Sequence, residues 1–509
     1  MVDSLRNSIV SWVMKKRFHQ IELFMKYPHD VQREWFETLI DSAKNTEWGK
    51  KYGYKDIQTY KDFKTRVPVQ DYDTLKVYID RIVKGEQNIL WPTEIKWFAK
   101  SSGTTSDKSK FIPVSKESLE DCHYKGGKDL ISIYYNYQPE SKLFTGRGLV
   151  LGGSSEVNQF SENSYYGDLS AVIIKNLPFW AEYQRTPSMD IALMPEWEEK
   201  IEKMAQISSE QDVTSITGVP SWTLVVLKRI LEIKNKKHII DVWPNLELYA
   251  HGGVAFTPYQ NQYEEIIGKP ITYLENYNAS EGFFGIQDLF GEDESGLLLM
   301  LDYGIFYEFM PIEELGKEFP DTKQLDEVEL GKNYAMIIST NGGLWRYLIG
   351  DTVSFTSLAP YRVRVTGRTK HFINVFGEEV IIDNAEEALR IACEKTNASV
   401  SEYTAAPVYM ENDQKGAHEW AIEFDQKPSD YSFFAEALDN ALKSINSDYE
   451  AKRYKNFVLE PLILHPVEKG TFYNWMKSRG KLGGQNKVPR LSHDRKYIDS
   501  ILSFVKVNR

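Results

Sequence analysis

Apolar positions in the middle of the chain follow two different periods. Short apolar runs at 148–151 and 246–250 predict buried strands, whereas apolar residues that recur every three or four positions at 196–206 and 221–234 predict amphipathic helices. Strands that alternate with helices favour an α/β sheet with helices covering it. We therefore expect the middle of the chain to form such a sheet.

Before residue 146 the helical period dominates. Segments 30–44 and 116–135 predict helices on either side of a polar loop at 101–108, and the apolar spacing at 9–24 predicts an amphipathic helix that packs on the body. No apolar run approaches the ~18–20 residues that span a bilayer. Basic residues follow the first apolar stretch, whereas in a secretion signal they precede it. We therefore expect a cytoplasmic protein without a membrane partner.

Closely spaced strands follow between residues 296 and 355. The predicted strands are 297–301, 327–329, 334–339 and 345–349. The turn Asn341-Gly342-Gly343 suits a hairpin between two of them. This region is expected to be antiparallel and barrel-like.

A second compact unit begins near Gly367. Its predicted strands are 371–375, 379–382, 406–409, 420–425 and 457–464, and its predicted helices are 384–395 and 432–444. This α+β pattern of ~140 residues has a normal domain size. We predict an N-terminal domain of mixed sheets with helical cover (1–368) and a small mobile C-terminal domain (369–509). Because no Pro/Gly-rich linker separates the two, a hinge must consist of a few residues.

Composition excludes several classes of protein. Apolar residues make up 42% and charged residues 26% of the 509 residues, which argues against disorder. A net charge of −12 without a basic block argues against a nucleic acid partner. Two cysteines, Cys122 and Cys393, cannot make a disulfide framework or a four-thiolate zinc site, and the nine histidines lack metal-ligand spacing. We expect a monomer whose cysteines are packing residues.

A loop rich in small hydroxyl residues occupies 101–110. Its N–H and O–H groups can bind a phosphate, and Lys110 adds a positive charge. It is not a Walker P-loop, because Ser102 and Asp107 stand where that motif requires glycine. The alternative is a polar surface loop without a ligand. The candidate phosphate-binding residues are Ser101, Ser102, Gly103, Thr104, Thr105 and Lys110.

A second candidate stretch, 277–282, follows an apolar strand at 271–274. An aromatic side chain at a strand end, such as Tyr277, can stack on a purine. Glu281 can hold Mg²⁺ that bridges triphosphate oxygens. The alternative is a helix capped by Ser280 with Glu281 in its first turn.

Three more polar side chains are candidates for the same site. Asp351 ends a strand and can accept both ribose hydroxyls, although Gly-Asp pairs are also common in turns. Arg368, at the domain boundary, can bond ribose or phosphate. Lys487 lies in the Gly/Lys-rich stretch 480–490, and a lysine on such a loop can enter a site when a domain closes.

In this order the motifs resemble those of the adenylate-forming superfamily, which activates carboxylic acids with ATP. In detail they are similar to the Gretchen Hagen 3 family of acyl acid amido synthetases, which includes the plant auxin- and jasmonate-conjugating enzymes. The family's loop SSGTSGGxxKLIP resembles 101–113, although Ser106 and Asp107 replace two glycines. Its Q-Y-K-x-P-R resembles 485–490, with Asn486 in place of tyrosine. The likeness spans essentially the whole chain.

The resemblance implies a role for each matched residue. It assigns adenine stacking to Tyr277, with Ala279 and Ser280 in the same motif, and ribose binding to Asp351. Glu281 would bind Mg²⁺ and phosphate, and Lys487 would be the catalytic lysine. Gly252 and Gly253 are further candidates for the ATP site, although a plain tight turn is the alternative for both. Arg368 is the last candidate, and it lies just before a hinge expected near Lys370-His371.

The position of the acyl site is also implied by the resemblance. The helix 116–135 and the segment with Val219 and Trp222 would line it. Tyr134, Tyr135 and Trp222 suggest an apolar or aromatic acid, although aromatic residues on helices are more often core.

The sequence therefore predicts an ATP- and Mg²⁺-dependent ligase that adenylates a carboxylic acid and transfers the acyl group to an amino acid. An acyl-CoA synthetase, with a thiol as acceptor, is the alternative enzyme. A non-catalytic nucleotide-binding protein is the alternative from another class. Five retained charges (Lys110, Glu281, Asp351, Arg368 and Lys487) argue against the last.

Overall fold

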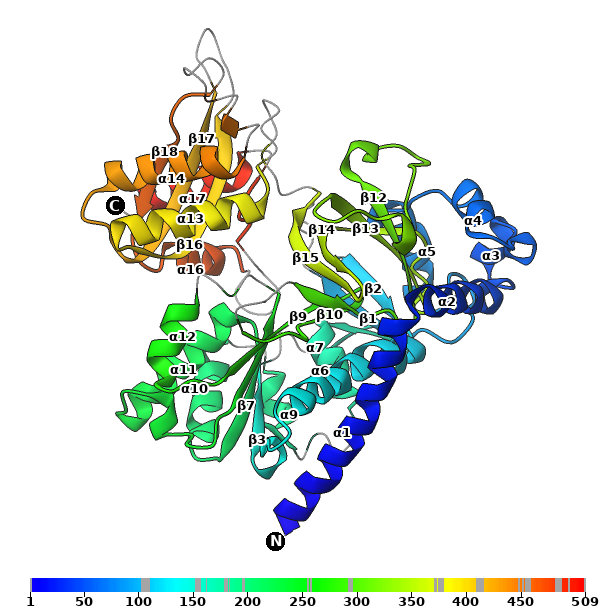
Figure 1. The fold of residues 1–509 in the computed structure, drawn as a ribbon, viewed down its shortest axis with the longest axis horizontal. Helices are drawn as coiled ribbons and strands as arrows, with labels where there is room; N and C mark the ends of the chain where they lie inside the picture. Colours follow the sequence, from blue (N-terminus) through cyan, green and yellow to red (C-terminus); the bar gives the residue numbers. More distant parts are fainter. Residues whose placement is uncertain are drawn as a thin grey trace.

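The computed structural model describes residues 2–101, 110–151, 157–161, 163–177, 182, 184–194, 197–253, 256, 259–291, 296–369, 373, 380–408, 416–446, 449–450, 453, 459–480, 488–492 and 495–507. Figure 1 shows a large N-terminal body and a smaller C-terminal body at its upper left. The long helix α1 (Val2–Lys26) runs along the edge of the large body. Ile21 and Phe24 on this helix are buried, so the predicted packing on the body is confirmed for its second half, whereas Val13 of the predicted apolar stripe is 44% exposed.

One 11-stranded sheet forms the centre of the large body. Its order is β12-β13-β14-β15-β11-β10-β9-β8-β7-β3-β6. The parallel strands are β3 (Arg147–Val150), β6 (Arg185–Thr186), β7 (Val213–Gly218), β8 (Leu248–Gly252) and β9 (Thr272–Ala279). The antiparallel strands beyond β9 are β10 (Gly282–Ile286), β11 (Leu297–Leu299), β12 (Ile305–Pro311), β13 (Asn333–Thr340), β14 (Tyr347–Leu358) and β15 (Tyr361–Arg368). Strand β9 therefore belongs to both halves of the sheet.

Helices connect and cover the parallel strands, because a parallel pair needs a crossover. These helices are α7 (Leu169–Lys175), α9 (Met189–Ala192), α10 (Trp197–Ser208), α11 (Pro220–Lys234) and α12 (Gln260–Ile267). Successive side chains of β8 point to opposite faces. Tyr249 joins the core under α11 and α12, whereas Ala250 joins the main core on the other face.

The first part of the chain packs against the antiparallel half. Its helices are α2 (Pro28–Ala43), α3 (Glu47–Lys51), α4 (Tyr60–Arg66), α5 (Tyr72–Val83) and α6 (Tyr124–Tyr137), the last preceded by a π-helical turn at Ser118–His123. A four-stranded sheet contains β1 (Trp97–Ser101), β2 (Lys110–Val114), β4 (Asn158–Ser161) and β5 (Ser164–Gly167). Strands β1 and β2 form an antiparallel pair, with Ser101 opposite Lys110.

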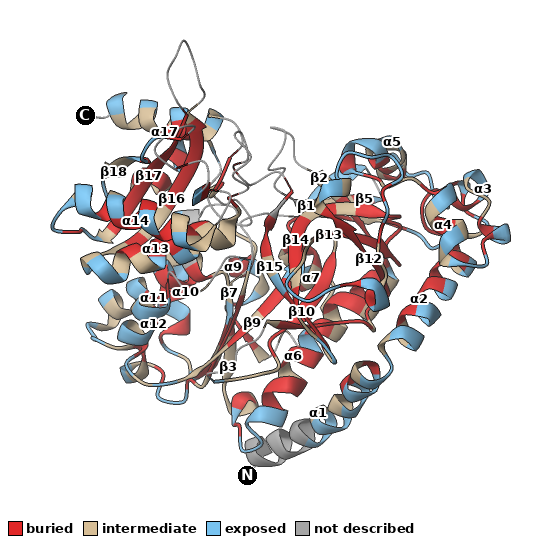
Figure 2. Cartoon of the chain, turned by 45° about the horizontal axis from the view of Figure 1, so that its top comes forward, coloured by how far each residue is buried: buried red, intermediate tan, exposed pale blue. Residues whose placement is uncertain are grey.

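The C-terminal body has its own core, which Figure 2 shows as a buried sheet between helices. Its strands are β16 (Ser399–Val408), β17 (Ala417–Gln426) and β18 (Ile463–Val467), and its helices include α13 (Ile382–Thr396), α14 (Tyr431–Ile445), α16 (Thr471–Ser478) and α17 (Lys496–Val507). Trp420 and Leu438 are fully buried in this core. The predicted mixed α/β architecture with a separate α+β C-terminal domain is confirmed. No described helix has both the length and the apolar character needed to cross a membrane.

The strand predicted at 327–329 is wrong. Glu327 ends a 3₁₀ turn (Leu325–Glu327), because its carboxylate accepts the Gln324 N–H at 2.9 Å and closes a local turn, and 328–329 are not in a strand. No helix begins at Ser280, which lies in the turn between β9 and β10. The predicted hairpin at Asn341-Gly342-Gly343 is confirmed, since it joins the antiparallel strands β13 and β14.

Candidate active site

A cavity of about 1710 Å³ lies between the two bodies. The carboxyl ends of the parallel strands β7, β8 and β9 form one wall, and residues from α13, β16 and the segment 488–490 form the opposite wall. Open α/β sheets place ligands at the carboxyl ends of their parallel strands. The cavity therefore lies where the topology predicts a binding site.

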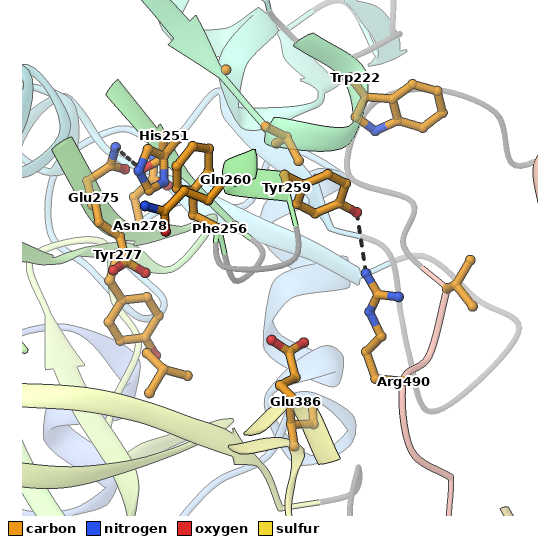
Figure 3. Close-up of a pocket in the computed structure, with 18 of the residues that line it drawn as sticks. Trp222, His251, Phe256, Tyr259, Gln260, Glu275, Tyr277, Asn278, Glu386 and Arg490 are labelled. Carbon is orange, nitrogen blue, oxygen red and sulfur yellow. Dashed lines mark hydrogen bonds between the residues drawn. The ribbon is translucent and has the colours of Figure 1, made fainter. Parts of the chain in front are cut away.

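Two predicted nucleotide-site residues meet in this cavity. The Tyr277 hydroxyl, on β9, donates to Oδ2 of Asp351, on β14, at 2.7 Å. Both side chains are buried, and 74 positions separate them in the sequence. Figure 3 shows the Tyr277 ring in the cavity wall. The hydrogen bond fixes a carboxylate beside an aromatic ring, as binding of a ribose and its purine requires.

The glycines at the end of β8 are required by the backbone. A Cβ on Gly252 would lie 2.3 Å from the carbonyl oxygen of Asn276, so no larger residue fits there. Gly253 has φ +81°, in the left-handed region that favours glycine. The Asn276 side-chain amide donates to the carbonyl oxygen of His251 at 2.8 Å and ties the turn to β9. A tight turn thus explains both glycines, and it also lines the cavity.

The turn after β9 carries the predicted Mg²⁺ ligand. Glu281 is half-buried at the cavity, beside Ala279. The neighbouring Ser280 hydroxyl is buried and has no hydrogen-bond partner among the described residues, so it is available to a ligand. The described residues contain no group of three or more metal-ligating side chains. One carboxylate fits Mg²⁺, because this ion commonly binds through one or two carboxylates together with phosphate oxygens.

Lys110 begins strand β2 and lines the cavity. Its ammonium lies 5.8 Å from the centre of the Tyr72 ring. Ser101 and Arg368 end β1 and β15, and the backbone of Arg368 pairs with Asp351. The predicted residues outside the described ones are Ser102, Gly103, Thr104, Thr105, Lys370, His371, Lys487 and the side chains of Ser101 and Arg368.

The apolar wall of the cavity differs in part from the prediction. Val219 and Trp222, at the N-terminus of α11, line it as expected. The helix that contains Tyr134 and Tyr135 does not, because both side chains are buried in the main core. Helix α7 provides the missing wall, including Leu169 and Ile173. The run 169–174 is apolar at five of its six positions without a helical period, so nothing in the pattern identified it as a pocket wall.

His251 was not predicted from the sequence. Its ring is buried, stacks on Phe256 at 4.2 Å between centroids, and lines the cavity (Figure 3). Its Nδ1 atom has no hydrogen-bond partner within the described part of the chain. Burial lowers the pKa of His251 to about 3, so the imidazole is neutral.

The wall from the C-terminal body carries charged side chains. Val488, Pro489 and Arg490 line the cavity immediately after the position of Lys487. Burial raises the pKa of Glu386 to about 6, and the nearby Arg490 opposes this shift. Burial also raises the pKa of Glu402, against the effect of Arg490.

Comparison with known families covers most of the chain. The GH3 family N-terminal domain matches residues 17–271, the GH3 family central domain matches 298–368, and the GH3 family C-terminal domain matches 383–496.

Named relatives are conjugating enzymes of plants. Indole-3-acetic acid-amido synthetase GH3.3 of Arabidopsis thaliana is 25% identical over 90% of this chain and 89% of its own length. 4-substituted benzoates-glutamate ligase GH3.12 of the same plant is 23% identical over 94% and 96% of the two chains. Jasmonoyl–L-amino acid synthetase GH3.5 of Oryza sativa subsp. japonica is 22% identical, with 94% of each chain covered.

Solved structures show the same fold. The structure of AtGH3.15 acyl acid amido synthetase in complex with 2,4-DB has a TM-score of 0.80 at 18% identity, and the match covers 97% of this chain and 96% of that one. A 2-hydroxyisobutyryl-CoA ligase in the postadenylation state has a TM-score of 0.59 at 11% identity over 94% and 91%. The overall arrangement is that of adenylate-forming ligases.

Proposed function

The chain belongs to the GH3 family, and from this premise we propose that it is an ATP-dependent acyl acid amido synthetase. It activates a carboxylic acid as an acyl-adenylate and transfers the acyl group to an amino acid. The observation that carries the proposal is the contact between Tyr277 and Asp351, because it joins a ring and a carboxylate in the same cavity as the apolar wall around Trp222.

In the first half-reaction a carboxylate oxygen of the acid attacks the α-phosphorus of ATP and pyrophosphate leaves. Tyr277 stacks on the adenine, next to the Gly252-Gly253 turn and Ala279. The Asp351 carboxylate accepts hydrogen bonds from the ribose hydroxyls. The Ser280 hydroxyl donates a hydrogen bond to a phosphate oxygen. Lys110 and the loop at its N-terminal side hold the β- and γ-phosphates, and Arg368 bonds ribose or phosphate. Glu281 would hold Mg²⁺, which when bound would offset the charge of the phosphates.

The acid lies against the apolar wall. Val219, Trp222, Leu169 and Ile173 remove water from its organic part, while its carboxylate points toward the nucleotide. Lys487 neutralises the negative charge that develops as the phosphorus–oxygen bond to pyrophosphate breaks.

In the second half-reaction the neutral amine of an amino acid attacks the acyl carbonyl, a C–N bond forms, AMP leaves and the amine loses a proton. Here residues 1–368 act as the platform and 369–509 as a mobile domain that turns about Lys370-His371. The turn removes Lys487 and admits the acceptor. A monomeric state and a cytoplasmic location remain predictions of the sequence.

Acid-dependent exchange of pyrophosphate into ATP tests the proposal. A panel of aliphatic and aromatic carboxylic acids is screened with the full chain and Mg²⁺, and at least one acid is expected to support exchange. Lys487→Ala is expected to lower that exchange by at least about a hundredfold, the usual order for loss of one group that stabilises transition-state charge. Absence of exchange with every acid would overturn the enzyme proposal.

The acceptor is tested separately. The accepted acid is supplied with ATP and either an amino acid or coenzyme A, and the product is identified by mass. An amide with the amino acid and no thioester supports amido synthetase activity, whereas thioester formation alone supports the acyl-CoA synthetase.

A further inference from the structure

Tyr259 of the large body contacts the C-terminal body through its hydroxyl group. This residue lies immediately before α12 and is 4% exposed. Its hydroxyl donates to Oε1 of Glu402 at 3.3 Å. It also accepts from Nη2 of Arg490 at 3.4 Å, as Figure 3 shows. Arg490 in turn donates through Nη1 to Oε2 of Glu402 at 2.7 Å. A neutral hydroxyl of one body therefore completes a charged pair of the other.

The Arg490 side chain is held in one place within its own body. Its guanidinium lies 4.7 Å from the centre of the Tyr403 ring. Burial opposes its charge, but Glu402 and the other polar neighbours outweigh burial and raise the pKa of Arg490. It remains charged, and a charged donor makes the stronger type of hydrogen bond.

The backbone around Arg490 is also fixed, to strand β16. The Ala405 N–H donates to the carbonyl oxygen of Arg490 at 2.8 Å, and the Ser492 N–H donates to the carbonyl oxygen of Ala405 at 3.0 Å. The Thr404 hydroxyl donates to the carbonyl oxygen of Pro489 at 2.6 Å. Lys487 precedes Arg490 by three residues, so the chain connecting them spans at most ~10 Å. The position of Arg490 therefore limits where Lys487 can be.

We propose that Tyr259 is a positioning residue for the adenylation half-reaction: it holds Arg490 and Glu402, and with them the segment 488–490, on the cavity wall. This inference rests on the proposed function. The arrangement is assigned to adenylation because Val488, Pro489 and Arg490 line the same cavity as Lys110 and Asp351. When the C-terminal domain turns for acyl transfer, the contact to Tyr259 breaks and water replaces it.

Among the described residues, two other polar side-chain pairs join the bodies. The Gln262 side-chain amide donates to Oδ2 of Asp425, and Lys477 pairs with Glu198. Both groups of the second pair are more than half exposed, at 53% and 59%, so water screens it. The Tyr259 contact differs because it is buried and lies on the cavity wall.

The test compares Tyr259→Phe with Tyr263→Phe. Tyr263 is a buried tyrosine of α12 whose hydroxyl donates at 2.7 Å to the carbonyl oxygen of Pro220, within the large body. Both variants lose one buried hydroxyl, but only Tyr259→Phe loses a contact between the bodies. Each half-reaction is measured alone: pyrophosphate exchange for adenylation, and amide formation from added acyl-adenylate and amino acid for transfer.

Tyr259→Phe is expected to lower the kcat of exchange about tenfold, which corresponds to about 1.4 kcal/mol, with unchanged KM for ATP and acid. In Tyr259→Phe, the rate of amide formation from added acyl-adenylate is expected to stay within about twofold of wild type. In Tyr263→Phe, the ratio of the exchange rate to the amide-formation rate is expected to stay within about twofold of the wild-type ratio. An equal loss in both half-reactions, or an unchanged rate of exchange, overturns the inference.

A structural readout separates this inference from the proposed function. The radius of gyration is measured by X-ray scattering for the unliganded wild type and both variants. Tyr259→Phe is expected to shift the population toward a more extended form, and Tyr263→Phe is not. If the wild type shows no exchange with any acid, the proposed function fails; an unchanged radius of gyration in Tyr259→Phe overturns the inference independently of that result.

Discussion

Two arginine–glutamate pairs lie close in sequence to predicted active-site residues, and they are built differently. Arg346 precedes Asp351 by five residues, and Arg490 follows Lys487 by three. The side chains of Arg346 and Glu308 are both 0% exposed, whereas those of Arg490 and Glu402 are 14% and 24% exposed. The first pair lies inside the large body, and the second belongs to the C-terminal body and contacts Tyr259 of the large body.

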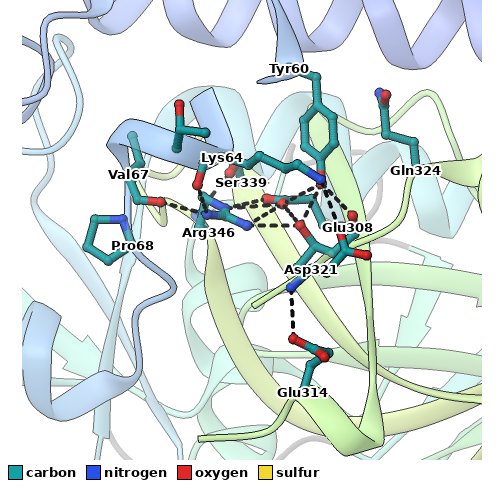
Figure 4. Close-up of polar contacts among 12 residues, drawn as sticks. Tyr60, Lys64, Val67, Pro68, Glu308, Glu314, Asp321, Gln324, Ser339 and Arg346 are labelled. Atoms are coloured by element: carbon teal, nitrogen blue, oxygen red, sulfur yellow. Dashed lines mark hydrogen bonds and ion pairs between the residues drawn. The ribbon is translucent and has the colours of Figure 1, made fainter. Parts of the chain in front are cut away.

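The Arg346 network closes on itself (Figure 4). Its guanidinium donates to the Glu308 carboxylate at 2.8 to 3.1 Å, to the carbonyl oxygens of Lys64 and Val67 at 3.0 and 2.6 Å, and to the Thr322 hydroxyl at 2.9 Å. These bonds hold Arg346 at φ 43°, a left-handed conformation that is strained for a side chain of this size. The network thus fixes the start of β14, the strand that contains Asp351.

The Arg490 network needs a hydroxyl from the other body to be complete. The two pairs therefore differ in whether their hydrogen bonds depend on contact between the two bodies. The Arg346–Glu308 pair (the sealed pair) fixes the start of β14 within one body, whereas the Arg490–Glu402 pair (the shared pair) has its full set of hydrogen bonds only while the two bodies are in contact. The following changes break or sharpen this contrast, beginning with the largest expected effect.

Glu308→Gln breaks the sealed pair. It leaves the charge of Arg346 buried without its carboxylate, which is expected to lower the free energy of unfolding by about 3–5 kcal/mol. Urea denaturation measures the loss. Glu387→Gln is the matched control, because Glu387 pairs with Arg390 at the surface, and it is expected to change stability by about 0.5 kcal/mol or less. If Glu308→Gln lowered the free energy of unfolding by less than about 1 kcal/mol, the Arg346–Glu308 pair would not be the more strongly stabilising of the two pairs.

Glu402→Gln breaks the shared pair and is expected to cost less, about 1–2 kcal/mol in urea denaturation. Arg490 retains the Tyr403 ring and the neighbouring Glu386, and the new amide oxygen can still accept from Arg490. Pyrophosphate exchange is expected to fall more than transfer from added acyl-adenylate. If Glu402→Gln lowered the free energy of unfolding as much as Glu308→Gln, the two arginine–glutamate pairs would contribute equally to stability, and the contrast would be wrong.

The pH dependence of stability sharpens the contrast through Glu386. Burial raises its pKa from 4.5 to about 6, while Arg490 opposes the shift and Asp383 and Glu402 add to it. Between about pH 4.5 and 6 the folded state binds more protons than the unfolded state, so this group makes stability fall as pH rises through that window. Glu386→Gln is expected to remove this slope and to be about 1 kcal/mol more stable than wild type at pH 7.

Urea denaturation at several pH values between about 4 and 8 measures this effect. Glu387→Gln, at the adjacent exposed position, is expected to keep the wild-type slope. An unchanged slope in Glu386→Gln would assign the pH dependence to other groups.

Lys477→Ala removes the exposed pair between the bodies and has the smallest expected effect. Because Lys477 and Glu198 are both more than half exposed, stability is expected to change by about 0.5 kcal/mol or less, and exchange by less than about twofold. Denaturation and exchange are measured in the same preparation. A tenfold fall in exchange would assign closure to this surface pair and not to Tyr259.

The sequence predicted the family, the enzyme class and most of the fold, because these depend on local patterns and ordered motifs. The helix predicted at 221–234 is α11, and the strand predicted at 420–425 lies within β17. Tyr277 and Asp351, chosen from separate motifs, lie in hydrogen-bond contact. The roles of these residues in binding and catalysis remain predictions.

The sequence could not predict contacts that depend on how distant elements pack. Tyr259 and Arg490 are 231 positions apart, and neither periodicity nor spacing links them. The helix with Tyr134 and Tyr135 was expected at the acyl site from the family resemblance, and its own pattern could not correct this, because an apolar stripe looks the same whether it lines a core or a pocket. His251 was passed over beside its two glycines, because a single histidine carries no spacing signal.

Strand β9 is paired in parallel with β8 on one edge and antiparallel with β10 on the other. The apolar wall of the cavity is built from segments on the parallel side, and Asp351 and Arg368 lie on the antiparallel side. In the proposed function, exchanging the segment from α7 to α11 with that of a relative would change acid preference while leaving the Gly252-Gly253 turn, Tyr277 and Asp351 in place.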